Sequence, residues 1–292
     1  MKALDLFCGA GGASLGLLRA GMEMVGCYDH DADACATHVR NLPDCPVTRA
    51  DLRWVDPGDL PAADFWWASP PCQPFSVAGK RLAGADPRDM FPWTLQAIAA
   101  RRPAWVAIEN PPGLLYAEQR GYIAGVVRSL ERAGYTVEHR VLDAVWYGVP
   151  QRRRRVILVG SREARRIRWP EHTHGDPRFL APFGDDRRPW VTMRQALGIA
   201  SEEPARMLDH PSQTIVSGHH GIHGYSPRHR AGYLVLGEGP VLMSQRQRAL
   251  IQGFTADYVF RGSSKSRDRQ IGNAVPPPLA TAVARAVLEA SA

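Results

Sequence analysis

The first 160 residues alternate between short apolar runs and longer stretches whose apolar residues recur with helical spacing. Apolar runs bounded by turn residues predict buried strands, and the stretches between them predict helices. The predicted strands are residues 2–7, 24–28, 46–49, 64–68, 105–108, 136–142 and 154–159, and the predicted helices are 13–20, 31–41, 88–101 and 120–133. This alternation predicts an α/β fold with a doubly wound, Rossmann-like and mostly parallel sheet.

The pattern breaks beyond residue 162, where Pro, Gly, His and Arg become frequent. Only two short helices are predicted there, at residues 192–197 and 244–251. Gly272 and Asn273 are predicted to form a turn, and a clean helix follows at 279–290 after three prolines. We therefore expect a small mixed domain at 166–267, inserted before the C-terminal helix, while residues 1–165 and 268–292 form the larger domain.

The charge balance points to an anionic partner. The net charge is +7, the sequence pI is about 9.4, and all but three of the 36 basic residues are Arg. Arginine suits bidentate contacts with phosphate and guanine, although a GC-rich genome would also enrich it. The sequence has no signal-peptide pattern and no apolar run long enough to span a bilayer, so we expect a cytoplasmic protein.

The cysteines argue against structural cross-links. The five Cys residues are odd in number and show no CxxC spacing, which predicts neither a disulfide framework nor a structural metal site. They stand at positions 8, 27, 35, 45 and 72.

Cys72 is set apart by its neighbours. It lies in the sequence Pro70-Pro71-Cys72-Gln73-Pro74, directly after the apolar run at 64–68. The prolines have nearly fixed φ and no N–H group, so they would present the thiol on a stiff loop. Such a thiol suits covalent catalysis. A buried, inert cysteine is the alternative that this fragment leaves open.

Three glycines follow the first predicted strand, in the stretch from Asp5 to Gly12. Glycines at this point of an open α/β sheet let a ligand approach the backbone. Asp29 ends the next strand, where it could accept hydrogen bonds from a ribose, and Asp51 ends the third, where it could meet an exocyclic amine. The loop has no phosphate-binding Lys, so it suits a nucleoside such as S-adenosylmethionine; a purely structural turn is the alternative.

Two further motifs carry charged or amide groups. Glu109-Asn110 follows the fifth predicted strand, on the same sheet edge as Cys72, where a carboxyl group makes chemical sense if it binds a base. It could instead be a surface residue that caps the strand. Gln151 precedes a run of four arginines. If this run is a strand, its side chains alternate between two faces, and Arg153 and Arg155 share one face. A solvated basic edge is the alternative for that run.

Together these motifs resemble the cytosine carbon-5 DNA methyltransferase family. The order matches: the Asp5–Gly12 loop, Pro71-Cys72-Gln73, Glu109-Asn110, Gln151-x-Arg153-x-Arg155, and Gly272 to Pro276. The resemblance covers residues 1–160 and 241–290. It implies a DNA (cytosine-5-)-methyltransferase with a Rossmann-like methyltransferase sheet. The cofactor would be S-adenosyl-L-methionine, with S-adenosyl-L-homocysteine as product, and the partner would be double-stranded DNA bound by a monomer of a restriction-modification system.

The resemblance also assigns roles to residues. Cys72 would add to carbon 6 of a cytosine flipped out of the duplex. Glu109, Arg155 and Arg153 would bind the base and complete the catalytic set. The cofactor positions would be Asp5, Phe7, Gly9, Ala10, Gly12, Asp29, His30, Asp51, Leu52, Pro71, Asn273, Ala274 and Val275. DNA contacts would come from Ser76, Lys80, Arg81, Asn110, Gln151, Arg228 and Arg230, and the 166–267 domain would recognise the target sequence.

The sequence departs from the family pattern at three points. Asp29 stands where Glu is typical, His30 where an aromatic side chain often packs on adenine, and Pro111-Pro112 replaces the usual Val. Two alternatives stay open beside the DNA enzyme. One is a tRNA cytosine-5 methyltransferase, because that branch shares the Ser69 to Phe75 sequence. The other is an inactive DNA-binding regulator that has kept the fold.

Overall fold

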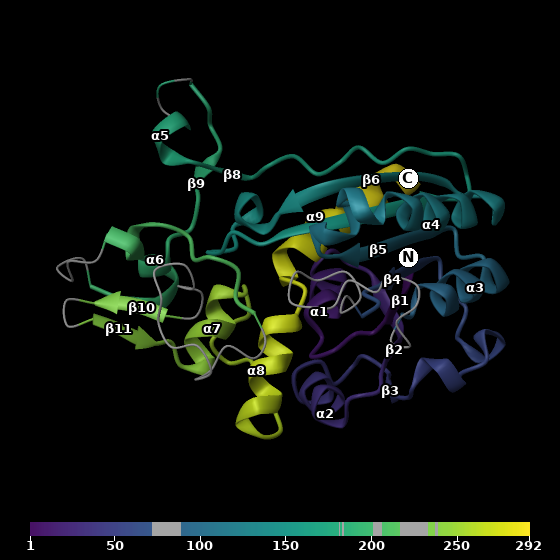
Figure 1. Cartoon of the computed structure of the whole chain (residues 1–292), viewed down its shortest axis with the longest axis horizontal. Helices are drawn as coiled ribbons and strands as arrows, with labels where there is room; N and C mark the ends of the chain where they lie inside the picture. Colours follow the sequence, from purple (N-terminus) through teal and green to yellow (C-terminus); the bar gives the residue numbers. More distant parts are fainter. Residues whose placement is uncertain (72–88, 181, 183, 201–205, 217–232, 237–238) are drawn as a thin grey trace.

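The computed structural model describes residues 1–71, 89–180, 182, 184–200, 206–216, 233–236 and 239–292. Its centre is a seven-stranded sheet with the order β3-β2-β1-β4-β5-β7-β6 (Figure 1). The strands are β1 Lys2–Leu6, β2 Glu23–Asp29, β3 Val47–Arg49, β4 Phe65–Ala68, β5 Trp105–Asn110, β6 Thr136–Asp143 and β7 Arg154–Ser161. The seven strands expected from the sequence are therefore confirmed, with ends shifted by one or two residues.

The sheet is mixed at one end. Strands β1 to β5 pair in parallel, whereas β7 runs antiparallel to both β5 and β6. Only residues 144–153 separate β6 from β7, and this link contains the 3-10 helix η6, Ala144–Tyr147. A parallel pairing needs a crossover of a dozen or more residues, so this short link imposes an antiparallel one.

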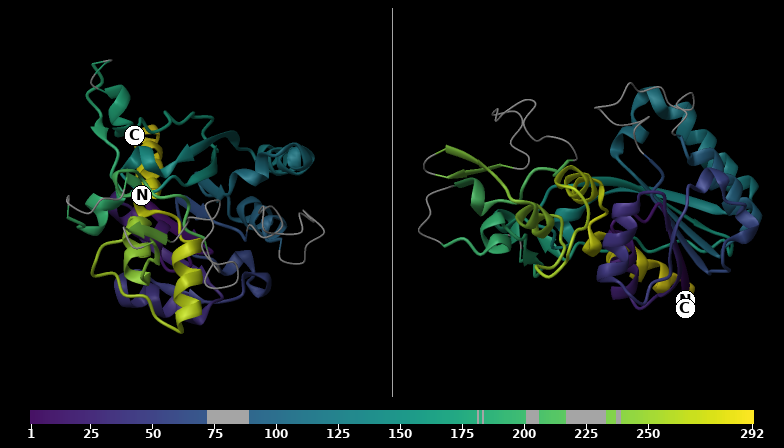
Figure 2. Two further views of the ribbon diagram at one scale, coloured as in Figure 1. Left: turned by 60° about the vertical axis from the view of Figure 1, so that its left-hand side comes forward. Right: turned by 90° about the horizontal axis from the view of Figure 1, so that it is seen from below.

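Helices cover both faces of the sheet. Helices α1, Gly12–Arg19, and α9, Pro277–Ser291, pack on one face, and α3, Phe91–Arg101, and α4, Arg120–Arg132, pack on the other (Figure 2). The strands are apolar on both faces for this reason: Trp67 belongs to the core under α1 and α9, and its neighbour Trp66 to the core under α3 and α4. The doubly wound arrangement is confirmed.

Helix α1 approaches α9 very closely. A Cβ atom on Gly16 would lie 2.5 Å from the Ala280 Cβ and 2.7 Å from the Pro277 carbonyl oxygen. Only glycine allows this approach, which holds the last helix against the first. Helix α2, Ala32–Asn41, lies between β2 and β3 in the chain, and its N-terminus is capped by the Asp31 side chain. The short 3-10 helices beside these elements are η1 Leu52–Trp54, η2 Pro57–Asp59, η4 Pro112–Leu115 and η5 Ala117–Gln119.

The remaining elements gather at the other end of the molecule (Figure 1). They are β8 His174–Gly175, α5 Pro177–Leu180, β9 Arg188–Pro189, α6 Met193–Leu197, η8 Arg206–Asp209, β10 Tyr233–Leu236, β11 Gly239–Leu242 and α7 Gln245–Ile251. A separate apolar cluster around Met193, Leu208 and Phe254 supports them. None of the helices in the described ranges is both long and apolar enough to cross a membrane.

The turn expected at Gly272-Asn273 is wrong. Both residues form the last turn of helix α8, Ser264–Asn273, whose N-terminus is capped by the Ser263 side chain. The predicted domain boundary at residue 267 therefore falls inside this helix. Ile271 of the same helix packs in the cluster of the small region, so α8 is a bridge between the two parts of the chain. The division into 1–165 with 268–292 and 166–267 stays a prediction.

Candidate active site

The carboxyl ends of β4 and β5 lie side by side, because Ala68 pairs with Ile108 in the parallel ladder. The Asn110 side-chain amide donates a hydrogen bond of 3.0 Å to the Pro70 carbonyl. Asn110 is 1% exposed. It therefore fixes the start of the Cys72 loop from within, and its side chain has no open surface for the DNA contact expected of it.

Glu109 and Arg155 form an ion pair at this edge. The Arg155 Nε lies 2.7 Å from the Glu109 Oε1, and the two side chains are 12% and 9% exposed. The sheet register explains the meeting, because Glu109 pairs with Ile157, two residues along β7 from Arg155. Glu109 and Asn110 are thus the last residues of β5, which is two residues longer than the predicted strand. Two residues to which the resemblance assigns one task therefore lie in direct contact.

Arg153 has a different environment from Arg155. It is 1% exposed, and its guanidinium donates to the carbonyl oxygens of Ile215, Gly272 and Ala274 at 2.9–3.0 Å. Ile215 belongs to the small region, Gly272 to the last turn of α8, and Ala274 to the link between α8 and α9. Arg153 thus holds three backbone segments together, and we call these contacts the Arg153 brace. It lies two residues from Arg155, which pairs with Glu109.

The Gln151 side chain contributes further contacts to the Arg153 brace. Its side chain is fully buried and donates to Gln252 at 2.6 Å and to the Ile251 carbonyl at 3.1 Å, while it accepts from the Ile215 N–H at 2.7 Å. A fully buried amide has no surface to offer to DNA. Gln252, which sequence reasoning did not single out, completes this network.

The alternation expected along the arginine run is confirmed in burial: Arg152 and Arg154 are exposed, Arg153 is buried and Arg155 is half-buried.

The glycine loop touches the segment after α8. A Cβ atom on Gly12 would lie 2.2 Å from the Val275 carbonyl oxygen, so glycine is required for this contact. Ala274 and Val275 are both buried, whereas Asn273 is exposed at the end of α8. The first and last motifs of the chain thus meet at one place, as expected if both serve one ligand.

Asp29 lies behind the loop. Its carboxylate accepts hydrogen bonds of 2.9 Å from the backbone N–H groups of Gly9 and Asp31. Phe7 has a positive φ of 62° and its ring meets Trp93 edge-on, with centroids 6.3 Å apart. Trp93 was not foreseen as a neighbour of this loop. Because it comes from α3, only the packed sheet reveals the contact.

The other expected cofactor positions lie around this loop. Leu52 and Ala10 are buried, and Ala10 accepts a hydrogen bond from the Tyr258 hydroxyl. The His30 side chain is 73% exposed, and its Nδ1 lies 3.4 Å from the Asp29 Oδ1. Pro71 is half-buried at the end of the described stretch.

Asp51 is already engaged in the structure. It caps η1 through the Arg53 N–H and pairs with the Arg53 guanidinium at 2.6 Å. The hydrogen bond from Arg53 lowers the pKa of Asp51 below its ordinary value. The carboxylate would therefore have to share its acceptor sites with any amine that binds here.

A buried polar chain runs beneath the loop. The Ser14 hydroxyl is 2.5 Å from the Asp5 Oδ2 and 2.9 Å from the His38 Nε2, and all three residues are fully buried. Desolvation raises the pKa of Asp5 to about 7 and lowers the pKa of His38 to about 4. Sequence reasoning found Asp5 but missed Ser14 and His38, which come from α1 and α2.

Several expected site residues lie outside the described residues. These are Cys72 among the catalytic set and Ser76, Lys80, Arg81, Arg228 and Arg230 among the expected DNA contacts.

Comparisons with known proteins identify the family of the chain. A family model for C-5 cytosine-specific DNA methylases matches residues 1–183 and 213–289. Type II methyltransferase M.AplI of Arthrospira platensis is 34% identical over 98% of this chain and 85% of its own length. M.NgoMIV of Neisseria gonorrhoeae is 30% identical over 99% of this chain and 97% of its own.

Solved structures share the fold. DNMT2 of Spodoptera frugiperda matches with a TM-score of 0.72 at 18% identity, covering 98% of this chain and 99% of its own. Dnmt2 methyltransferase of S. pombe matches with a TM-score of 0.70 at 17% identity, covering 99% and 98%. From the family match and the full-length relatives, we conclude that the chain belongs to the C-5 cytosine-specific DNA methylase family.

Proposed function

We propose that this DNA (cytosine-5-)-methyltransferase works through a transient bond from the Cys72 sulfur to carbon 6 of a cytosine flipped out of duplex DNA. The observation that carries the proposal is the Glu109–Arg155 ion pair, beside the anchored start of the Cys72 loop. A carboxyl group and a guanidinium together match the edge of cytosine, which offers a ring nitrogen, an amine and a carbonyl oxygen.

Each residue then has a definite task. The Cys72 thiolate adds to carbon 6, and the ring electrons move toward the carbonyl oxygen, where Arg155 stabilises the developing negative charge. Glu109 accepts a hydrogen bond from the exocyclic amine, and in its protonated form it donates to the ring nitrogen, which takes up part of the negative charge. Arg155 also holds Glu109, so one guanidinium orients both the base and its carboxyl partner. After methylation, loss of the carbon-5 proton expels the thiolate and restores the ring.

We propose S-adenosylmethionine as the cofactor, and the structure of the loop fits it. Gly9 has a positive φ of 52°, and a Cβ atom there would meet nothing within 4 Å, so the backbone lies open to a ligand. Asp29 lies next to Gly9, and no basic residue stands between Asp5 and Gly12. A nucleoside without phosphate suits these groups. When bound, it would supply the electrophilic methyl group.

We also propose the biological setting. The relatives with matching lengths are named Type II methyltransferases, which favours a role in a restriction-modification system in the cytoplasm. The monomer would read a short DNA sequence with the 166–267 region. Ser76, Lys80, Arg81, Arg228 and Arg230 would contribute DNA contacts, and Arg153 and Gln151 would position the site without touching the base.

Bisulfite sequencing of plasmid DNA from cells that express the protein tests this proposal. We expect methylated cytosines in one short sequence context with the wild type, and none with Cys72→Ala. Cys45→Ala is the matched control, because it removes a buried thiol that lies outside the site. Methylation by Cys72→Ala at the wild-type level would refute the covalent route.

A second assay checks the adduct and the substrate. A duplex with 5-fluorocytosine at the mapped position should form a complex with the wild type that survives denaturation. In a separate assay of methyl transfer, tRNA should give no methylated product. Transfer to tRNA but not to DNA would refute the proposal in favour of an RNA substrate.

A further inference from the structure

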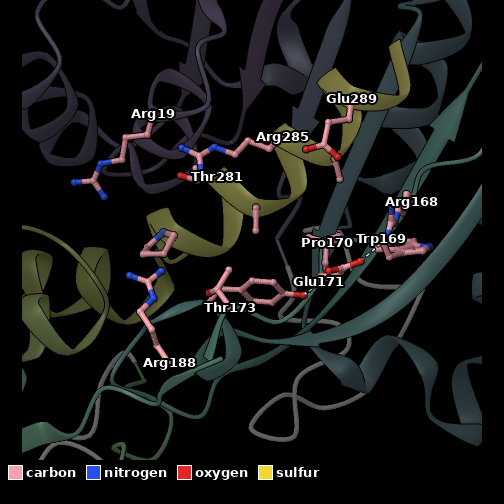
Figure 3. A pocket seen from close by; sticks show the side chains of 14 residues that line it. Arg19, Arg168, Trp169, Pro170, Glu171, Thr173, Arg188, Thr281, Arg285 and Glu289 are labelled. Atoms are coloured by element: carbon pink, nitrogen blue, oxygen red, sulfur yellow. Dashed lines mark hydrogen bonds and ion pairs between the residues drawn. The ribbon is translucent and has the colours of Figure 1, made fainter. Parts of the chain in front are cut away.

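A cavity of about 700 Å³ lies away from the catalytic edge, on the outer side of α1 and α9 (Figure 3). It is lined by the end of α1, by one stripe of α9 and by residues 168–171, 173 and 188. Tyr147 and Trp169, both buried, are part of its lining. Three arginines come to it from separate elements: Arg19 from α1, Arg285 from α9 and Arg188 from β9.

In the described part of the chain none of the three guanidinium groups forms an ion pair, although the charge of Arg19 helps to lower the pKa of Asp257. In the described ranges of the chain, no carboxylate lies within ion-pair distance of Arg19, Arg188 or Arg285. The fourth arginine of the lining, Arg168, is paired with Glu171 at 2.5 Å. Four arginines thus face two glutamates, Glu171 and Glu289, and the cavity keeps a positive excess.

The cavity is separate from the catalytic site. Helix α1 begins just after the carboxyl end of β1, and Arg19 is its last residue, so Arg19 lies about 12 Å farther along the helix, toward the amino edge of the sheet. Arg285 lies in the second half of α9, on the same face of the sheet. Figure 2 shows α9 running to the C-terminus, which lies close to the N-terminus. Nothing in the catalytic scheme uses these arginines.

Positive charge continues beyond the cavity. The Arg152 guanidinium lies over the rings of Trp146 and Trp190, at 5.7 and 5.0 Å from their centroids. Trp146 also stacks with His172, and its carbonyl accepts a hydrogen bond from the N–H of Thr173, a residue of the cavity lining. The rings hold the exposed Arg152 in place beside the cavity, and arginines clustered on one face are typical of a surface that contacts nucleic-acid phosphates.

We propose that this cavity and its rim bind the phosphate backbone of a second segment of duplex DNA, apart from the segment that is methylated. The guanidinium groups are exposed, so a small anion would gain little from them in water. A duplex gains more, because several phosphates are neutralised together and their counterions are released. The surface holds the protein on DNA while the catalytic site searches a neighbouring segment.

Sedimentation velocity with a labelled 15-base-pair duplex of arbitrary sequence tests the proposal, and it does not depend on Cys72 chemistry. At low salt we expect two duplexes per wild-type chain and one per chain of the double variant Arg19→Ala/Arg285→Ala. The control is Arg128→Ala/Arg132→Ala, which removes the same charge from exposed positions of α4 on the other face of the sheet. The control should retain two duplexes.

Two more measurements sharpen the result. Removing two phosphate contacts should lower the slope of log affinity against log salt, for the second duplex, by about 2. Arg188→Ala, which alters neither helix, should weaken the second duplex by an intermediate amount. A wild type that saturates with one duplex would overturn the proposal. Equal losses in the α1–α9 variant and in the α4 control would do the same, since they would reflect net charge alone.

Discussion

The arginines at the catalytic edge and those of the α1–α9 cavity have the same chemistry and opposite surroundings. Arg153 and Arg155 are largely withdrawn from water, and their described contacts are fixed carbonyl or carboxylate oxygens. Arg19 and Arg285 are exposed, and no carboxylate in the described structure pairs with either. A buried guanidinium is costly without partners, so its position is fixed by its neighbours. An exposed guanidinium stays free to take a phosphate.

The largest effect that tests this contrast is on stability, at Arg153. Arg153→Met keeps the apolar volume but removes the guanidinium donor of the Ile215, Gly272 and Ala274 carbonyls, and leaves Ala274 only a long bond of 3.5 Å from Gln252. Unsatisfied buried carbonyls cost roughly 1–3 kcal/mol each, less what relaxation recovers, so we expect a loss of about 3–5 kcal/mol. Urea unfolding measures the loss.

Arg154→Met is the control for that variant, because the neighbouring side chain is exposed. Its stability should stay within about 0.5 kcal/mol of the wild type. Equal stability of the two variants would mean that the buried contacts of Arg153 do not distinguish it from a surface arginine.

The second effect is on catalysis, at Arg155. Arg155→Ala removes the partner of Glu109 and the donor for the base carbonyl, and we expect single-turnover methyl transfer to fall about 10²–10³-fold. The fall should appear in kcat more than in KM, because the stabilised charge develops during reaction. Arg155→Lys should restore part of the rate. A fall confined to KM would assign Arg155 to substrate binding alone.

The contrast also explains how far the sequence could predict the molecule. Strand positions could be predicted because apolar runs report burial locally, and the family resemblance gave roles to Glu109 and Arg155. The ion pair between them appears only once β7 pairs with β5. The contacts of the Arg153 brace could not be predicted from the sequence. Arg153 meets Gly272 and Ala274 across 119 and 121 residues, and Gln151 meets Gln252 across 101. No local pattern distinguishes such an arginine from one that binds DNA.

The prediction of a turn at Gly272-Asn273 was wrong for a related reason. Glycine and asparagine favour turns, but the Gly272 carbonyl is held by Arg153 and the Ala274 N–H bonds to the Gln270 carbonyl, which keeps the helix intact to Asn273. Long-range contacts override local preference there. The chain from Asp5 through Ser14 to His38 was hidden in the same way, since its members come from three elements.

Asp5 is an acidic group to compare with the buried arginines. It is fully buried, and its described hydrogen bond comes from a neutral hydroxyl. Its pKa is raised to about 7 in the folded state, so its contribution to stability is complete at low pH and is lost as the pH rises through 7. His38 acts in the opposite direction: its pKa is lowered to about 4, so stability is lost as the pH falls from about 6.5 toward 4.

The Asp5→Asn variant separates the two groups. It removes only the first contribution, so the free energy of unfolding of Asp5→Asn relative to wild type should rise by about 2 kcal/mol between pH 5 and pH 8. Urea unfolding across that range measures it. Parallel pH profiles for the two proteins would mean that Asp5 does not change its charge in this range.

The smallest effect is expected at the cavity. Arg19→Ala/Arg285→Ala removes two exposed guanidinium groups that form no described ion pair, so the free energy of unfolding should change by less than about 0.5 kcal/mol. A rise in stability would also be consistent, because both groups face the positive excess of the cavity. A loss near that of Arg153→Met would show that the cavity arginines are structural, and would end the contrast between the two regions. Thermal and urea unfolding at low salt, where surface charges are least screened, give the strictest measurement.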